Sequence, residues 1–420
     1  MVVGRERPTV AFATLGCRMN QFDTDFIRSK FLLKGYREVP FNERADIYIV
    51  NTCTVTKGAD RDSRKYIYRA KRQNPSAVVV ATGCYAQVSP QELASLKEVD
   101  LVVGNTHKDQ ILTLVEEYLE RKNPGKVFVG EIFREGEVKN FDLVVSFEHT
   151  RPFLKVQEGC NSFCTFCVIP YARGKVRSVP PERVVEAVKK LADAGYKEVV
   201  LTGTQLSQYG WDLKDGTNLL RLLERLVQIE GIEYFRLSSM SVAEIDKDLL
   251  ELITTSPKIA PHFHLSLQSG SNRILELMHR NYTREEYAEK VLKIVERRPE
   301  TAIGTDIIAG FPTETKKDFE ETLRFAEEMP FAYMHIFPYS DRPFTKASKI
   351  EPKVPPQVIK ERVKLLKEVD REKRTLFREK MRGKTLRALV LGNGELLTEN
   401  YITLPDDGTH KKGEIVRVKL

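Results

Sequence analysis

Six cysteines carry the clearest chemistry in this chain of 420 residues, and they fall into two sets. Cys160, Cys164 and Cys167 lie within eight residues, a spacing that suits one metal centre better than disulfide bonds. A structural zinc site is normally closed by a fourth ligand, whereas an iron–sulfur cluster on three thiolates keeps one iron open. The triplet therefore predicts a metal centre, with His149 as the nearest fourth ligand if the metal is zinc.

The other three cysteines, Cys17, Cys53 and Cys84, are far apart in the sequence but share a local setting. Each follows, by three residues, a run that reads as a strand; the runs are 9–14, 46–50 and 77–81. Helical segments around 23–34 and 59–72 separate the runs, which predicts a parallel sheet. Loops after parallel strands share one edge of the sheet, where ligands bind. The three thiols should therefore converge on a second iron–sulfur cluster; three unrelated buried cysteines are the alternative.

The elements that must position these cysteines divide the chain into five segments. We expect an N-terminal open parallel α/β sheet, a polar β-rich connection, a central barrel, a basic linker helix and a small C-terminal β-barrel, in the ranges 1–125, 126–150, 151–359, 360–382 and 383–420. The first segment should have a fourth strand at 101–104 and a helix at 108–118.

The central segment alternates strands and helices six times, which predicts a (βα)6 partial TIM barrel. The expected strands are 153–156, 198–201, 234–237, 262–267, 302–308 and 333–337, and helices include 181–194, 219–229, 284–297 and 316–328. Such barrels work at the C-terminal ends of their strands, and the cysteine triplet follows the first strand. A helix at 360–380 and antiparallel strands at 386–391, 395–400 and 414–419 complete the chain.

Charge favours a polyanionic partner. The net charge is +8, and residues 57–74 hold seven basic and two acidic side chains, while residues 360–387 hold twelve and five. A nucleic acid fits these runs, and small β-barrels often bind oligonucleotides; solvated helix faces are the alternative. No apolar run is long enough to span a membrane, so we expect a cytoplasmic protein.

Segment 157–167 (QEGCNSFCTFC) resembles the cluster-binding signature of the radical S-adenosylmethionine (SAM) enzymes. The order of a three-cysteine domain, a radical SAM core and a small basic β-domain resembles the methylthiotransferase family, whose C-terminal module is the RNA-binding, OB-like TRAM domain. The matching motifs are TLGCRMN at 14–20, NTCTVT at 51–56, GCYAQ at 83–87, LSLQSGS at 265–271 and TDIIAGFP at 305–312.

That resemblance implies two 4Fe-4S clusters with distinct tasks. The cluster on Cys160, Cys164 and Cys167 would cleave SAM to a radical that abstracts hydrogen, and the cluster on Cys17, Cys53 and Cys84 would supply sulfur, which a second SAM methylates. An electron donor such as flavodoxin or ferredoxin is implied as well. Five residues are weaker candidates for contacts with SAM: Phe166, Thr204, Gln268, Arg280 and Asp306.

The family has three branches, which modify tRNA with threonylcarbamoyladenosine, tRNA with isopentenyladenosine, or an aspartate of a ribosomal protein. Arg18, followed by Gln21 and Phe22, and the segment HIFPYSDRP at 335–343 resemble the threonylcarbamoyladenosine (MtaB-type) branch. The resemblance thus implies methylthiolation at C2 of that base at position 37, in the tRNA anticodon stem-loop. The other two branches remain alternatives, and so does a non-catalytic protein that binds RNA or zinc.

Overall fold

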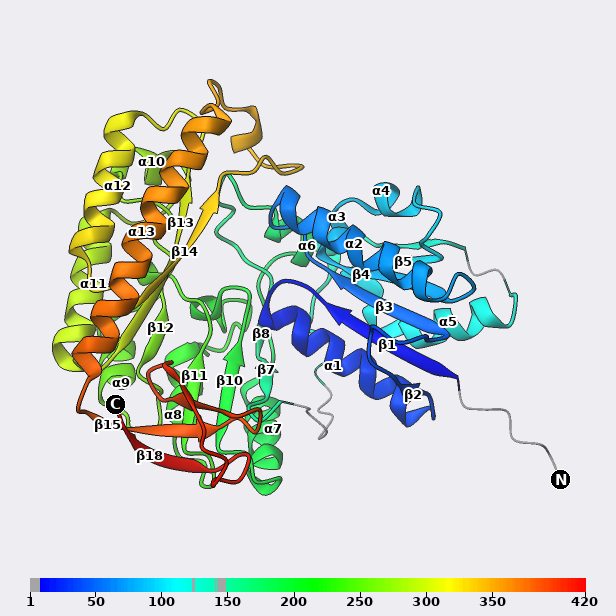
Figure 1. Ribbon diagram of the computed structural model, residues 1–420, viewed down its shortest axis with the longest axis horizontal. Helices are drawn as coiled ribbons and strands as arrows, with labels where there is room; N and C mark the ends of the chain where they lie inside the picture. Colours follow the sequence, from blue (N-terminus) through cyan, green and yellow to red (C-terminus); the bar gives the residue numbers. More distant parts are fainter. Residues whose placement is uncertain (1–7, 123–124, 140, 142–148) are drawn as a thin grey trace.

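A computed structural model of the chain describes residues 8–122, 125–139, 141 and 149–420. An N-terminal α/β layer structure stands beside a central curved set of parallel strands, and a small C-terminal sheet lies at one end of those strands (Figure 1). No helix in the described part of the chain combines the length and apolarity needed to cross a bilayer.

The N-terminal sheet has six parallel strands in the order β2-β1-β3-β4-β5-β6. They are β1 (Thr9–Thr14), β2 (Arg37–Glu38), β3 (Ile47–Thr52), β4 (Val78–Gly83), β5 (Leu101–Val103) and β6 (Val127–Phe128). Every residue of β3 and β4 is buried, because helices cover both faces of the sheet. One face packs on α1 (Arg18–Leu33), η1 (Asn105–Gln110) and α5 (Ile111–Leu119), and the other on α2 (Lys57–Gln73), α3 (Cys84–Val88) and α4 (Pro90–Ala94).

The prediction that each cysteine follows its strand by three residues is correct for Cys17 alone. Strands β3 and β4 run two residues further than expected, so Cys53 and Cys84 follow them directly. Two of the extra residues are polar side chains that donate to neighbouring elements: the Asn51 amide donates to the Asn20 carbonyl at 2.9 Å, and the Thr52 hydroxyl donates to the Thr82 carbonyl. Because these partners come from neighbouring elements, strand patterning alone did not reveal the extension.

Strand β6 pairs with β5, so the N-terminal sheet continues past the predicted boundary at residue 125. In its described residues, the segment expected to be a β-rich connection contains this strand and a single 3-10 turn, η2 (Ile132–Arg134); its residues 140 and 142–148 lie outside the described part.

The central strands form two parallel three-stranded sheets, β11-β10-β7 and β12-β13-β14. Isolated parallel bridges, Phe235 to Ile259 and Met240 to Leu265, join the two sheets into a curved set of six strands. The strands are β7 (Phe153–Lys155), β10 (Glu198–Thr202), β11 (Tyr234–Leu237), β12 (His262–His264), β13 (Ala302–Ala309) and β14 (Tyr333–Pro338). Strand β12 is shorter than the expected 262–267, since Leu265 contributes only a bridge.

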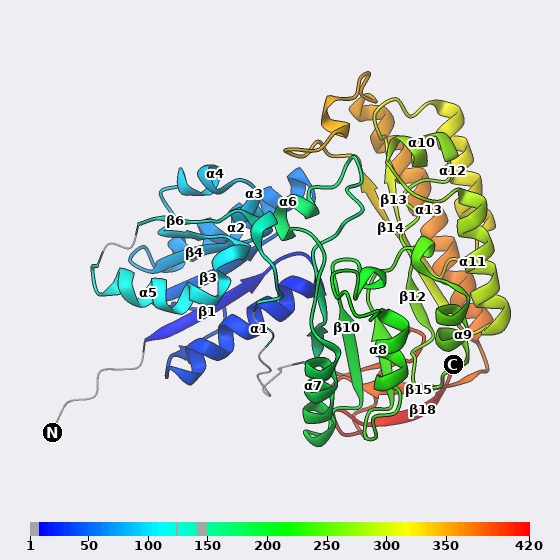
Figure 2. The same ribbon diagram turned by 180° about the vertical axis from the view of Figure 1, so that it is seen from behind.

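Helices cover the outside of this partial barrel (Figure 2). They are α7 (Pro181–Asp193), α8 (Leu219–Leu226), α9 (Lys247–Thr255), α10 (Asn272–Leu277), α11 (Arg284–Arg297), α12 (Lys316–Glu328) and α13 (Pro356–Met381), with 3-10 turns η3 (Leu206–Gln208), η4 (Val242–Glu244) and η5 (Ala347–Lys349). The expected linker helix is α13, which packs along β14 and α12 through Leu366 and Val369. On the side between β14 and β7, helix α1 of the N-terminal layer packs against β7.

The C-terminal strands form an open antiparallel sheet, β17-β16-β15-β18. They are β15 (Thr385–Val390), β16 (Glu395–Thr398), β17 (Thr403–Pro405) and β18 (Ile415–Lys419). Within residues 383–420, all of them described, no pairing joins edge strands β17 and β18, so the predicted closed β-barrel is not confirmed.

The turn between β16 and β17 closes the N-terminal end of the barrel. Tyr401 stacks on His262 with ring centroids 4.1 Å apart, and Arg18 of α1 donates to its hydroxyl at 3.0 Å. Arg236 of β11 lies over the same ring, donates to the Glu399 carbonyl at 3.0 Å and pairs with the buried Glu198 carboxylate at 2.7 Å. The two halves of the barrel and the C-terminal sheet therefore meet around Tyr401.

Removing the Arg236 charge should destabilise the fold. In an Arg236→Met variant the buried Glu198 keeps only Arg151, at 3.5 Å, so we expect the free energy of unfolding to fall by about 3 kcal/mol. Urea unfolding of the metal-free protein measures it. The matched control is Arg225→Met, which breaks the exposed pair with Glu182 and should cost less than about 1 kcal/mol. If both variants lost the same free energy of unfolding, burial would not explain why the Arg236–Glu198 pair matters more than the exposed pair.

Candidate active site

Cys17, Cys53 and Cys84 lie at the same edge of the N-terminal sheet, because they follow the neighbouring strands β1, β3 and β4. Cys17 is exposed, while the other two are buried. Gly16 adopts φ +90°, and a Cβ there would lie 2.8 Å from Cys53 Sγ, so only glycine lets Cys53 approach the residue before Cys17. Burial, with Cys84 and Cys17 as charged neighbours, raises the pKa of Cys53 to about 12. The three cysteines thus lie at one edge of the sheet, and their binding of a shared cluster stays a prediction.

The triplet occupies a loop between β8 (Gln157–Glu158) and α6 (Ile169–Arg173). The loop starts at Gly159, where φ is +79° and a Cβ would lie 1.8 Å from the Lys175 carbonyl oxygen. This glycine lets the loop turn tightly against β9 (Arg177–Ser178), the antiparallel partner of β8. The Cys167 N–H donates to the Cys164 carbonyl at 3.0 Å, so the loop turns back on itself between these two cysteines. Burial and the neighbouring Cys164 and Cys160 raise the pKa of Cys167.

The two cysteine sets are linked through a pair of short helices. Helix α3 begins at Cys84, and α6 begins two residues after Cys167. Cys84 and Val88 pack with Val168 and Ala172 in a small apolar cluster, and the Asn105 amide donates to the Ala172 carbonyl at 2.7 Å. The two sets therefore lie on the two sides of the contact between the N-terminal layer and the barrel.

The sulfur geometry suits clusters better than single ions. Thiolates hold zinc at about 2.3 Å, which puts the ligands of one tetrahedral ion about 4 Å apart. Among the described residues, two groups of His, Cys, Asp or Glu bring three ligand atoms within 4.8 Å of one another, and neither group contains a cysteine. His149, the expected fourth ligand of a zinc site, instead lies against Phe153 and Asp25. Soft thiolates spaced more widely than one ion allows are the donor set of an iron–sulfur cluster.

Three of the predicted SAM-contact residues surround the triplet. Arg280 donates to Cys164 Sγ at 3.2 Å, to the Ser266 carbonyl at 3.2 Å and to the Tyr282 hydroxyl at 2.9 Å. The Thr204 hydroxyl accepts from the Gly159 N–H at 3.2 Å. Phe166 packs in an apolar cluster with Met278, Ile308 and Phe311. Their contacts with SAM stay predictions, but their place beside the triplet is as expected.

The other two lie further along the barrel strands. Gln268 has φ +74°, and its backbone continues the pairing with β13 through an N–H bond to the Asp306 carbonyl at 2.8 Å. The Asp306 carboxylate accepts from the Ser266 hydroxyl at 2.9 Å and faces His264 Nε2 at 3.0 Å and His335 Nδ1 at 3.2 Å. Both of its oxygens therefore already have protein partners, and a contact with SAM remains a prediction.

Sequence reasoning missed a buried charged group between the two cysteine sets. Asp23 of α1 lies against Lys108, Lys155 and Arg173, and its carboxylate is fully buried. Although burial opposes ionisation, these three cations hold the pKa of Asp23 well below its ordinary value. One sign was visible in the sequence: Lys155 interrupts an apolar strand, where a charge needs a partner.

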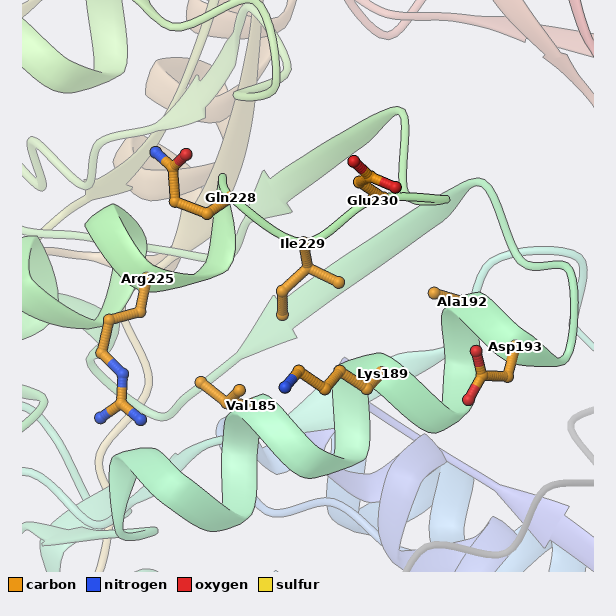
Figure 3. Close-up of a pocket in the computed structure, with 8 residues that line it drawn as sticks. All are labelled: Val185, Lys189, Ala192, Asp193, Arg225, Gln228, Ile229 and Glu230. Atoms are coloured by element: carbon orange, nitrogen blue, oxygen red, sulfur yellow. The ribbon is translucent and has the colours of Figure 1, made fainter.

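A groove on the outer surface of the barrel is unrelated to these groups. It lies between α7 and α8 (Figure 3). No cysteine and no predicted SAM-contact residue lines it; the lining residues are Val185, Lys189, Ala192, Asp193, Arg225, Gln228, Ile229 and Glu230.

Comparison with known proteins agrees with this geometry. Residues 9–104 match the model of an uncharacterised protein family, UPF0004, and residues 154–326 match the Radical SAM superfamily. In fold, the chain is similar to the radical S-adenosylmethionine methyltransferase TsrM from Kitasatospora setae, with a TM-score of 0.61 and 14% identity over 82% of this chain and 77% of that one. The parallel barrel and its cysteine triplet define a radical SAM enzyme.

Relatives of known name narrow the class. The chain is 67% identical to the threonylcarbamoyladenosine tRNA methylthiotransferase MtaB of Aquifex aeolicus, over 97% of this chain and 99% of that protein. It is 35% identical to the tRNA-2-methylthio-N(6)-dimethylallyladenosine synthase of Moorella thermoacetica, over 99% and 96%. The chain belongs to the family of threonylcarbamoyladenosine tRNA methylthiotransferases, MtaB.

The exposures of the thiols predict an order of alkylation. In metal-free folded protein, iodoacetamide should label the exposed Cys17 rapidly and the buried Cys53 slowly, because at pH 8 a thiol with a pKa near 12 is about one part in ten thousand thiolate. Labelling of Cys53 should accelerate about tenfold per pH unit from pH 7 to 9. Peptide mass spectrometry measures both, with protein in denaturant as the control. Equal rates at Cys17 and Cys53 in the folded protein would contradict the described burial.

Proposed function

We propose that this enzyme methylthiolates C2 of N6-threonylcarbamoyladenosine at position 37 of tRNA, using two 4Fe-4S clusters and two molecules of SAM. The observation that carries the proposal is the pair of three-cysteine sets that the α3–α6 contact joins. The identity of 67% to an MtaB protein supports this branch over the isopentenyladenosine branch, whose named relative is 35% identical.

The chain's own residues would divide the work. Cys160, Cys164 and Cys167 would hold the cluster that supplies one-electron cleavage of SAM. Cys17, Cys53 and Cys84 would hold the auxiliary cluster, from which sulfur is transferred. Arg280 donates to Cys164, and such a bond stabilises negative charge on a ligating sulfur. The α3–α6 contact fixes the separation of the two sites, so the substrate base would enter between them. A tRNA substrate and a flavodoxin or ferredoxin as electron donor suit a cytoplasmic protein.

An exposed aromatic cluster beside the triplet supports binding of single-stranded RNA. Phe133 and Phe163 stack with centroids 6.2 Å apart, Tyr171 packs edge-on to both, and Phe344 lies 5.4 Å from Tyr171. Phe344 is 63% exposed. Phe163 and Phe344 both have positive φ, a costly backbone for an aromatic residue that tends to persist at functional sites. Exposed rings that already stack can take bases of a loop that has opened.

Helix α2 adds the charge that such a surface needs. Arg61, Arg69 and Arg72 are exposed, and within the described residues none of them has a carboxylate at ion-pair distance. The first residue of this helix, Lys57, donates its N–H to the Ser340 hydroxyl, four residues before Phe344 in sequence. The aromatic cluster and the basic helix are thus joined through the same loop, and together they would bind the anticodon loop by stacking and phosphate contacts.

The substrate branch can be tested with two tRNAs. Reconstituted protein, SAM, reductant and sulfide should add a methylthio group to tRNA with threonylcarbamoyladenosine and not to tRNA with isopentenyladenosine, as read by nucleoside mass spectrometry. A Cys53→Ala variant should still cleave SAM but form no methylthio product. Product only on the second tRNA would move the enzyme to the other branch. SAM cleavage with no product on either tRNA would point to a protein substrate.

The aromatic cluster can be tested by binding alone. A Phe344→Ala variant should bind a fluorescent anticodon stem-loop about tenfold more weakly, because one stacked base contributes about 1–3 kcal/mol. Phe344→Trp should retain the affinity. The control is Tyr118→Ala, which removes an exposed ring from α5, a helix outside this surface. Unchanged affinity in Phe344→Ala would remove the cluster from the RNA-binding surface.

A further inference from the structure

A group of six buried charges lies between the two cysteine sets. Four cations and two carboxylates make it up: Lys108 of η1, Lys155 of β7, Arg173 of α6, Arg177 of β9, Asp23 of α1 and Glu158 of β8. None of the six residues is more than 8% exposed. The group spans both the N-terminal layer and the barrel, so it is part of their interface.

The contacts within the group are short and shared. Arg173 pairs with Glu158 at 2.6 Å and with Asp23 at 3.1 Å, and it also donates to the Asn20 amide oxygen at 2.6 Å. Lys155 pairs with Asp23 at 2.8 Å, and Lys108 pairs with the other oxygen of Asp23. Arg177 lies 3.7 Å from Glu158 and donates to the Arg173 carbonyl. Each carboxylate thus serves at least two cations.

The group therefore holds more positive than negative charge in a site without solvent. An uncompensated buried charge is strongly destabilising, so an excess of cations requires a further anion nearby. The Nε–H groups of Arg173 and Arg177 are buried and have no hydrogen-bond partner in the described part of the chain. Two donors thus remain available for an acceptor that the side chains do not supply.

The missing anion should lie at the auxiliary cysteines. Helix α6 ends at Arg173, and its neighbour Val168 and its residue Ala172 pack directly against Cys84. The Asn105 amide lies 3.9 Å from Cys84 Sγ and bonds the carbonyl of Ala172, the residue before Arg173. A cluster on three thiolates is an anion, and it becomes more negative when it is reduced or takes a further sulfur ligand.

We propose that this buried cationic group, centred on Arg173, compensates the charge of the auxiliary cluster and raises its reduction potential. The proposal rests on the two-cluster function proposed above. Arg173 acts here as a positioning and tuning residue, since it influences the cluster through charge and through its unpaired donor. The same excess charge favours a sulfide or methylthio ligand on that cluster, because either ligand adds negative charge.

The test measures the potential of the auxiliary cluster by itself. A variant with Cys160, Cys164 and Cys167 all changed to alanine is reconstituted with iron and sulfide and titrated with dithionite under electron paramagnetic resonance. Adding Arg173→Met should lower the ratio of reduced to oxidised cluster at a fixed potential about tenfold, as expected for loss of one nearby charge in a partly buried site. Adding Arg173→Lys should restore most of the ratio. Adding Asp23→Asn, which removes a negative charge, should raise it.

Two further measurements separate tuning from support of the fold. Arg236→Met removes an equally buried arginine whose neighbours are Glu198 and Tyr401, so it should lower stability without moving the potential. Iron and sulfide content is determined for every variant. A bound cluster whose potential is the same in Arg173→Met and Asp23→Asn overturns this inference and leaves the proposed function intact. Failure of the parent variant to bind any iron overturns the two-cluster proposal and this inference together.

Discussion

The contact between Asp23 and its three cations holds the two halves of the molecule in register. Asp23 and Lys108 belong to the N-terminal layer, and Lys155 and Arg173 belong to the barrel. A buried network of this kind is directional, so it fixes the approach of two surfaces more strictly than apolar packing does. The small apolar cluster around Cys84 and Val168 sits beside it and shares the same constraint. The relative position of the two cysteine sets therefore depends on charged residues that belong to neither set.

Much of the fold was predictable, because the strands carry apolar runs that helices bury on both faces. The runs that became β1, β3, β4, β10 and β13 were found close to their observed bounds. The two-residue strands β2 and β6 were not found, since they exist only through their pairing with β1 and β5. The ends of β3 and β4 were placed too early because Asn51, Thr52 and Thr82 look like loop residues until their distant partners are known. Three of the four C-terminal strands were predicted, but not β17 (Thr403–Pro405) or the open form of the sheet.

In the candidate site, the close spacing of Cys160, Cys164 and Cys167 in the sequence was enough to predict a metal centre. The other three cysteines were grouped because each follows a predicted strand. The charged group between them left little trace, since its members are up to 154 residues apart and only Lys155 stands in a conspicuous place. The same holds for Tyr401, which reaches the barrel from the C-terminal sheet and stacks on His262. Sequence patterns detect hydrophobic residues that repeat at the spacing of a helix or a strand. Charged and aromatic side chains that meet across a domain contact follow no such repeat.

The two cysteine sets differ in how much of the chain must be folded before they exist. The triplet is contained in one loop, so its three sulfur atoms can meet as soon as that loop forms. The other three thiols come together only after β1, β3 and β4 have paired in the correct parallel order. Such pairing joins residues far apart in the sequence, and it forms slowly. Under the proposed function, a chain with a misassembled N-terminal sheet would keep the site for SAM cleavage and lose the site for sulfur. The strand order of this sheet therefore decides whether the second set of thiols forms a site at all.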